Sequence, residues 1–221
     1  DFGREDRKNL IHKTKSAWLQ PLTSLDHEDD DPGTVWNKEA RERDKDRMSP
    51  RKAWRAIQAG MPQDAIISSD IGNNCAIGNA YPTFEKARKY LAPGLFGPCG
   101  YGFPSILGAK IGCPDTPVIG FAGDGAFGIS MNEMSSCARE EWPAITMVIF
   151  RNYQWGAEKR NSILWFNDNF VGTELDPELS YAKIADACGS KGVIVKNTDE
   201  LTQAIKISCE EQQKGITTFI E

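Results

Sequence analysis

Two apolar runs separated by one helix length constrain the fold more than any other feature of the sequence. Residues 118–122 and 145–150 are short and apolar, which is typical of buried parallel strands. Between them, apolar residues recur at helical intervals from about 128 to 140, and the pair Trp142-Pro143 is expected to end that helix. Because such strand, helix and strand units close right-handedly, the sequence predicts an α/β protein with a doubly wound parallel sheet.

Polar residues follow both predicted strands. Gly123-Asp124-Gly125 forms a turn after the first strand, and Asn152 and Gln154 come soon after the second. Both positions lie beyond strand carboxyl ends, where open α/β sheets bind ligands. Magnesium prefers about six oxygens, and the Asp124 carboxylate, the Asn152 amide and the Gln154 backbone carbonyl can supply part of that set beside diphosphate oxygens and a water. A lone Gly-Asp-Gly is usually a plain turn, but this context favours a magnesium diphosphate site.

These residues resemble the diphosphate domain of thiamine diphosphate enzymes, whose signature is Gly-Asp-Gly and, a little under thirty residues later, Asn-Asn. Here Arg151 stands in place of the first Asn, while Asn152, the metal ligand of that family, is present. The glycine-rich segment 97–110 resembles the family segment that lies under the thiazolium ring, with Cys99 where the family usually has Met. The loop 69–74 resembles the other loop that contacts the diphosphate.

Within that superfamily, four runs are similar to the sulfoacetaldehyde acetyltransferases: 27–34, 69–73, 123–133 and 152–159. The resemblance spans essentially the whole chain but only the C-terminal part of such an enzyme. It implies thiamine diphosphate and Mg²⁺ as cofactors, and the conversion of sulfoacetaldehyde and phosphate to acetyl phosphate and sulfite. Three alternatives stay open, namely an acetolactate-synthase-like carboligase, a 2-oxoacid decarboxylase, and a non-catalytic cofactor-binding module.

The motifs and the resemblance together predict one cofactor site at the ends of the strands. Its predicted members are Asp70, Ile71, Gly72, Asn73, Cys99, Tyr101, Asp124, Gly125, Ala126, Asn152, Gln154, Trp155 and Gly156. Asp124, Asn152 and Gln154 are the predicted metal ligands. No catalytic residue is expected in this chain, because in the family the glutamate that activates the aminopyrimidine belongs to the pyrimidine-binding domain. Glu133 is not expected to replace that glutamate, and His12 and His27 lie in the charged lead-in.

Three basic residues near the metal motif are candidates for binding a sulfonate or phosphate. Arg151, Lys159 and Arg160 qualify because guanidinium and ammonium groups bind tetrahedral oxyanions. One alternative is that Arg151 pairs with a core or interface carboxylate. Another is that the basic and aromatic stretch 159–171, which is expected to be rich in loops, forms a subunit contact.

The composition of the chain excludes some classes of function. A net charge of -5, from 26 basic and 31 acidic residues, predicts no nucleic-acid partner. The sequence shows neither a secretory signal nor a run of apolar residues long enough to span a membrane, so we expect a cytoplasmic protein without a membrane partner. The six cysteines show no zinc spacing and are expected to be reduced and buried, with Cys99 the exception.

Two parts of the chain differ in character. Residues 1–48 are dense in charge and are predicted to be an interdomain connector, whereas 49–221 are predicted to form the cofactor-binding domain. Ser49 and Asn197 are predicted helix caps, and the last residues, 217–221, form a predicted strand, so we expect C-terminal truncation. The expected partners are small anionic substrates and the pyrimidine-binding domain of the same or a neighbouring subunit, in a homodimer or homotetramer.

Overall fold

The computed structural model describes residues 48–84, 86, 88–167 and 169–221. Except for Met48, the predicted connector and both histidines, His12 and His27, lie outside these described residues. None of the helices in the described part combines the length and the apolar character needed to cross a bilayer.

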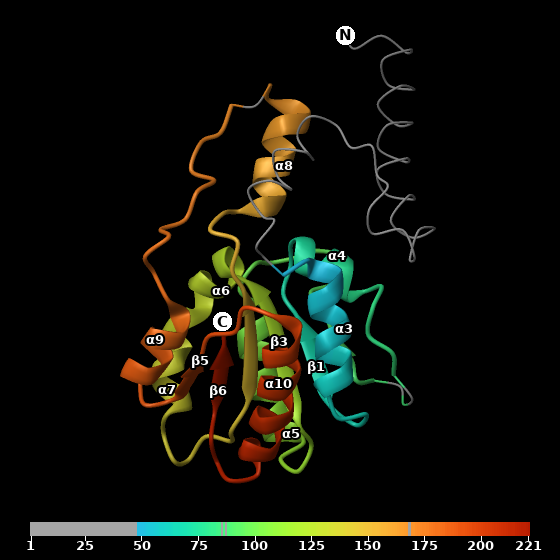
Figure 1. The fold of residues 1–221 in the computed structure, drawn as a ribbon, viewed down its shortest axis with the longest axis vertical. Coiled ribbons are helices and arrows are strands. Elements are labelled where there is room, and N and C mark those ends of the chain that lie inside the picture. Colours follow the sequence, from blue (N-terminus) through green and yellow to red (C-terminus); the bar gives the residue numbers. More distant parts are fainter. Residues whose placement is uncertain (1–47, 85, 87, 168) are drawn as a thin grey trace. The chain divides into compact units, whose positions relative to one another are not determined.

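Six parallel strands form one sheet in the order β2-β1-β3-β4-β6-β5 (Figure 1). The strands are β1 Ile66–Ser69, β2 Tyr90–Leu91, β3 Val118–Gly123, β4 Thr146–Phe150, β5 Lys191–Val193 and β6 Thr218–Ile220. The two strands predicted from the apolar runs are β3 and β4, which are neighbours at the centre of the sheet. The polar residues that follow them therefore leave the sheet side by side.

Side chains of the central strands point alternately into two helical layers. In β3, Ile119 and Phe121 join one hydrophobic cluster, whereas Val118 and Ala122 join the other. The first cluster packs against α3 Pro50–Gly60, α4 Asn73–Gly78 and α10 Thr198–Gln212, and the second against α5 Gly102–Gly112, α6 Asp124–Ser130, α7 Met134–Cys137 and α9 Tyr181–Ala187. A strand covered on both faces is apolar throughout. Helices on both faces of a parallel sheet confirm the predicted doubly wound α/β fold.

The predicted capping residues begin their helices. Ser49 accepts a hydrogen bond from the Lys52 N–H at 3.3 Å, and Pro50 takes the first position of α3. Asn197 accepts one from the Glu200 N–H at 2.9 Å at the start of α10. These local interactions were predictable because each involves residues within one helical turn.

The helix after β3 differs from its prediction. It was expected from about 128 to 140, but α6 begins at Asp124 and ends at Ser130, and the 3-10 turn η1 (Met131–Glu133) separates it from α7. Gly123 ends β3 with extended backbone and is also the N-cap of α6, so strand passes directly into helix. Serine and asparagine side chains compete for backbone hydrogen bonds, which disfavours a continuous helix through this stretch.

The stretch expected to be rich in loops contains a further helix, α8 (Gly156–Trp165). None of its residues is buried, so no apolar periodicity marks it in the sequence. Its first turns contain Ala157, Glu158, Lys159 and Arg160, which have high helix propensity. Here intrinsic propensity predicts the structure better than hydrophobic pattern does.

The cysteines are all free, but the expectation of burial holds for only half of them. Those buried are Cys75, Cys137 and Cys209, whereas Cys188 is half-buried and Cys99 and Cys113 are exposed. Cys113 is the C-cap residue of α5, just beyond the last residue of that helix.

Gly192 of β5 tests how tightly α9 packs on the sheet. A Cβ added there would lie 2.0 Å from the Ala182 carbonyl oxygen, which is backbone and cannot rotate away. We expect Gly192→Ala to lower the free energy of unfolding by at least about 3 kcal/mol. Gly108 in α5 is the control, because its Cβ would meet nothing within 4 Å. Gly108→Ala should be neutral or stabilising by about 0.5–1 kcal/mol, and similar urea midpoints for both variants would contradict this packing.

Candidate functional site

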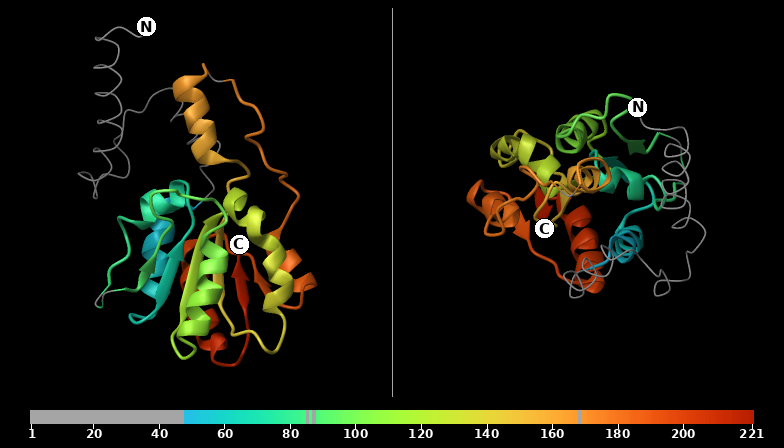
Figure 2. Two further views of the ribbon diagram at one scale, coloured as in Figure 1. Left: turned by 180° about the vertical axis from the view of Figure 1, so that it is seen from behind. Right: turned by 90° about the horizontal axis from the view of Figure 1, so that it is seen from above.

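Four loops meet at the carboxyl edge of the sheet. Residues 70–74 follow β1, the strand-to-helix turn at 123–126 joins the end of β3 to α6, and 151–156 follow β4. These three strands are adjacent. The fourth loop, 97–102, leads into α5 and contacts the end of β1. Seen from behind, the ribbon shows α8, in light orange, beyond this edge (Figure 2, left). The predicted cofactor residues all belong to these four loops.

Asp70 fixes the first of these contacts. Its buried carboxylate accepts hydrogen bonds from the backbone N–H groups of Ile71 at 2.8 Å, Gly100 at 3.0 Å and Gly102 at 2.7 Å. Burial raises the pKa of Asp70, and the three amides oppose that rise. The carboxylate predicted to contact the cofactor is thus engaged by the chain itself, and it holds loop 97–102 against β1.

Asp124 joins the loops after β3 and β4 in the same way. Its carboxylate oxygen Oδ2 accepts from the N–H groups of Asn152 at 3.0 Å and Tyr153 at 2.6 Å, and Oδ1 accepts from Gly125 at 3.1 Å. The side chain is 3% exposed, and burial raises its pKa. A cation bound here would favour the ionised form of this carboxylate.

Asn152 and Gln154 lie in the loop that Asp124 holds through the Asn152 and Tyr153 N–H groups. The side chain of Asn152 lies in an exposed loop, where Oδ1 accepts from the Gln154 N–H at 3.2 Å. Gln154 forms an antiparallel bridge with Glu174, but its two hydrogen bonds use the Trp155 N–H and the Tyr153 carbonyl. The Gln154 carbonyl is therefore not consumed by that bridge. The three predicted metal ligands supply a carboxylate, an amide oxygen and a carbonyl, all of which suit a hard cation.

Glycines allow these loops to approach closely. A Cβ on Gly125 would lie 2.8 Å from the Trp155 ring, and one on Gly156 would lie 2.9 Å from Asn152 Nδ2 and 3.2 Å from Asn73 Nδ2. The side-chain amides of Asn73 and Asn152 thus meet over Gly156. Gly72 has a φ of +109°, and a Cβ there would meet no heavy atom within 4 Å. The space at this position is therefore open.

The remaining predicted residues line the same loops. Ile71 packs against Gly97, and Ala126 is buried in α6 near Gly100. Tyr101 is the half-buried N-cap residue of α5. Partial burial, with the charges of Asp70 and Glu158, raises the pKa of Cys99, so this thiol stays protonated.

The three candidate anion-binding residues have partners within the chain. Arg151 forms an ion pair with Glu221, which is the carboxylate pairing left open as the alternative. Lys159 lies 2.5 Å from a Glu174 oxygen and 5.1 Å from the centre of the Phe170 ring. Arg160 is half-buried on α8 and also interacts with other groups.

Tyr181 belongs to the site, although no sequence pattern marks it as a functional residue. Its hydroxyl donates to the Asp124 carbonyl at 2.8 Å, and the side chain is buried. In the sequence, this tyrosine only marked the apolar face of a predicted helix. No local pattern connects it with a turn 57 residues away.

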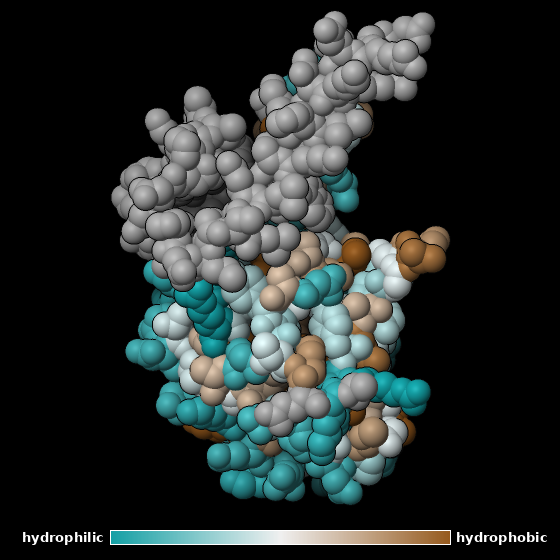
Figure 3. All heavy atoms as spheres, turned by 90° about the vertical axis from the view of Figure 1, so that its right-hand side faces the viewer, coloured by the Kyte–Doolittle hydropathy of each residue, from teal (hydrophilic) through white to brown (hydrophobic). Residues whose placement is uncertain are grey.

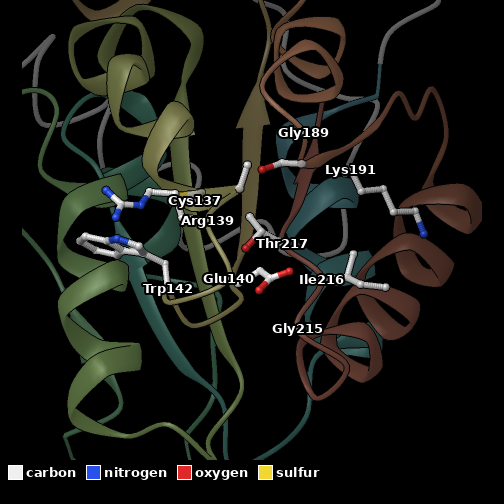
Figure 4. A pocket seen from close by; sticks show the side chains of 11 residues that line it. Cys137, Arg139, Glu140, Trp142, Gly189, Lys191, Gly215, Ile216 and Thr217 are labelled. Carbon is white, nitrogen blue, oxygen red and sulfur yellow. The ribbon is translucent and has the colours of Figure 1, made fainter.

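A cavity of about 310 Å³ lies elsewhere, between the loops that precede β4, β5 and β6 (Figure 4). Its lining comes from 137–142, 189–191 and 215–217. None of the predicted cofactor residues contributes to that lining. The candidate site is therefore the convergence of loops at the opposite edge, not this cavity.

A known family shares this architecture, a parallel sheet with ligand-binding loops at its carboxyl edge. Residues 70–221 match the family described as thiamine pyrophosphate enzyme, C-terminal TPP binding domain. This match covers more than half of the chain, so the chain belongs to that family. This match confirms the resemblance to thiamine diphosphate enzymes, and with it the thiamine diphosphate cofactor predicted from the sequence.

Individual proteins similar to this chain include both curated sequences and a solved structure. Over its full length, the chain is 73% identical to a probable sulfoacetaldehyde acetyltransferase of Rhizobium meliloti (strain 1021). It is also 69% identical over its full length to the sulfoacetaldehyde acetyltransferase of Roseovarius nubinhibens. The chain spans 37% of the length of each of these relatives. A solved thiamine diphosphate-dependent 4-hydroxybenzoylformate decarboxylase of Rhodococcus jostii RHA1 matches with a TM-score of 0.71 and 25% identity, over 80% of this chain and 32% of that one.

The residues at this edge fit the diphosphate of thiamine diphosphate. The side-chain amides of Asn73 and Asn152 both lie close to Gly156, where they can donate to phosphate oxygens, and a Cβ at Gly72 would enter open space. Within the described residues, no group of three or more His, Cys, Asp or Glu could hold a metal ion. A cation at Asp124 would therefore depend on amide, carbonyl and diphosphate oxygens, as magnesium sites in phosphate-binding proteins do.

Asp70→Ala tests whether Asp70 fixes the loops. The change would leave three backbone N–H groups without their acceptor, so we expect the cofactor-free protein to lose at least about 3 kcal/mol of unfolding free energy. Asp64→Ala is the control, because Asp64 is exposed just before β1 and should change stability by less than about 0.5 kcal/mol. Equal urea midpoints for the two variants would instead favour a direct role of Asp70 in binding cofactor.

Proposed function

We propose that this protein uses thiamine diphosphate and Mg²⁺ to convert sulfoacetaldehyde and phosphate to acetyl phosphate and sulfite. The observation that carries the proposal is full-length identity of 69–73% to relatives that bear the name sulfoacetaldehyde acetyltransferase. Because the chain spans 37% of those relatives, the activity belongs to an assembly of this domain with others.

Each loop has a role in this proposal. Asp124, Asn152 and the Gln154 carbonyl hold magnesium, while Gly72, Asn73 and the loops around Gly125 and Gly156 hold the diphosphate. When bound, the cofactor supplies the nucleophilic carbon that protein side chains lack. Asp70 and Asp124 keep the loops assembled before the cofactor enters, which lowers the cost of ordering them on binding.

The activating glutamate is proposed to come from the pyrimidine-binding domain of the same or a neighbouring subunit, in a homodimer or homotetramer. Large exposed apolar side chains near the site support such a contact. Leu95 and Phe96 precede loop 97–102 and are almost fully exposed, and α8 is followed by exposed Phe166, Phe170 and Val171. In the space-filling view, hydrophobic surface interrupts the hydrophilic surface on the upper part of the domain (Figure 3). Large exposed apolar side chains that gather near a site are typical of protein contacts.

Lys159 and Arg160 remain proposed contacts for sulfonate or phosphate, since α8 carries both at the edge of the site. Each would have to exchange or share its present partner. Cytoplasmic location is likewise proposed, and the six free cysteines are consistent with a reducing compartment.

The alternatives differ in what supports them. An acetolactate-synthase-like carboligase or a 2-oxoacid decarboxylase would use the same residues for metal and diphosphate, so geometry alone does not separate them from an acetyltransferase. The high identity to sulfoacetaldehyde acetyltransferases favours the proposed substrate. A non-catalytic module has less support, because Asp124 and Asn152 are both present and are held together by a hydrogen bond.

The proposed reaction can be tested with the full-length protein. With thiamine diphosphate, Mg²⁺, sulfoacetaldehyde and phosphate, we expect sulfite and acetyl phosphate to form in equal amounts. Pyruvate serves as the competing substrate, since a carboligase or decarboxylase would consume it. Consumption of pyruvate without release of sulfite from sulfoacetaldehyde would exclude the acetyltransferase proposal while leaving the cofactor site intact. Residues 1–221 alone should be inactive until the other domains are added.

Asp124→Asn should strongly weaken the magnesium-dependent binding of thiamine diphosphate. The substitution removes the ionised ligand that anchors magnesium to the diphosphate, so calorimetry should show thiamine diphosphate affinity falling by at least about a hundredfold. Asp115→Asn is the control, because Asp115 is exposed before β3 at the opposite edge. Unchanged affinity in a folded Asp124→Asn protein would contradict the metal role.

The pH dependence of magnesium binding tests the same carboxylate. Burial raises the pKa of Asp124, so protons compete with magnesium at higher pH than they would at an exposed aspartate. Magnesium affinity should therefore rise with pH through that pKa and level off above it. In Asp124→Asn, this dependence should disappear.

A further inference from the structure

An ion pair lies just behind the predicted metal ligands. Arg151 pairs with Glu221, and their side chains are only 16% and 4% exposed. The second oxygen of Glu221 accepts from the Ser180 hydroxyl at 2.7 Å and from the Ala182 N–H at 3.0 Å. Arg151 Nη2 donates to the Pro177 carbonyl at 2.6 Å. The pair therefore ties together the ends of β4 and β6 and the segment that enters α9.

This ion pair sits at the base of the excursion that carries α8. Arg151 directly precedes Asn152, where the chain leaves β4. The chain returns through Glu174, which bridges Gln154, and reaches Pro177 two residues after Leu175. Both ends of the excursion are thus fixed, one through the backbone next to Arg151 and one through its guanidinium group.

The segment held by Glu221 also holds the turn of Asp124. Tyr181 lies between Ser180 and Ala182, and its hydroxyl donates to the Asp124 carbonyl at 2.8 Å. Its ring packs edge-on against Phe127, with centroids 5.2 Å apart. Burial raises the pKa of Tyr181 to about 12, so the hydroxyl remains a donor at neutral pH.

We propose that Arg151, Glu221 and Tyr181 are positioning residues that set the placement of Asp124 and Asn152 and thereby the affinity for the divalent cation. The inference rests on the proposed metal role of those two ligands. It gives Arg151 a function different from binding substrate. Buried ion pairs add little net stability compared with apolar replacements, whereas groups behind metal ligands commonly govern metal affinity.

The main test is the double variant Arg151→Met/Glu221→Gln in the full-length protein. It removes both charges, so neither is left buried alone, and Gln keeps an acceptor for Ser180 and Ala182. The probe is Mn²⁺ in the presence of thiamine diphosphate, with free Mn²⁺ measured by electron paramagnetic resonance. We expect the dissociation constant for Mn²⁺ to rise by about tenfold or more, while the melting temperature of the metal-free protein changes little.

A second ion pair provides the matched control. Lys191 and Glu211 lie 2.6 Å apart and join β5 to α10, away from the candidate site. Lys191 belongs to the lining of the cavity at the other edge (Figure 4). Lys191→Met/Glu211→Gln should leave the Mn²⁺ affinity unchanged. If it weakens binding as much as the first double variant does, the effect is general loosening and the proposal is wrong.

Two single variants sharpen the result. Tyr181→Phe removes only the hydroxyl that reaches Asp124 and should weaken Mn²⁺ binding several-fold, so the proposal stays testable if the double variant does not fold. Arg151→Lys keeps the charge and should bind Mn²⁺ more tightly than the double variant. If Tyr181→Phe and the folded double variant both bind Mn²⁺ with wild-type affinity, the proposal is wrong. Absence of Mn²⁺ binding by the wild type would instead overturn the proposed metal site itself.

Discussion

The site depends on one kind of interaction. At the end of a strand, a buried aspartate accepts hydrogen bonds from backbone N–H groups of a neighbouring loop. Asp124 holds the loop after β4, and Asp70 holds the loop before α5. Each carboxylate is buried at a cost that raises its pKa. Charge-assisted hydrogen bonds offset that cost and fix the geometry of the loops. Two similar side chains thereby assemble most of the cofactor edge from the chain's own backbone.

The two aspartates nevertheless differ in what they leave available. Both carboxylates accept hydrogen bonds from three backbone N–H groups, and Asp70 uses two of its three to hold loop 97–102. Asp124 holds the backbone N–H of Asn152, in a loop where Asn152 is exposed and where the bridge to Glu174 does not use the Gln154 carbonyl. A cation can therefore complete the second arrangement with oxygens only. Aspartate thus assembles loops at both positions, and in our proposal Asp124 also binds metal.

The site faces outward on an edge where apolar side chains are exposed. Leu95 and Phe96 extend from one side, and the excursion carrying α8 extends from another. An isolated domain gains nothing by exposing such groups, since burying them is favourable. This agrees with our proposal that another domain completes the cofactor site.

The sequence by itself determined the sheet, the helix caps and the adjacency of Asp124 and Asn152. Those features follow from short continuous apolar runs, from local capping residues, and from the rule that parallel strands end at one edge. The tertiary structure alone decided that Arg151 pairs with Glu221, 70 residues away, and that the Tyr181 hydroxyl reaches the Asp124 turn. It also decided that Asp70 is consumed by backbone amides. Such partners are set by how distant segments pack, and no local pattern of polarity encodes which distant group a polar side chain will meet.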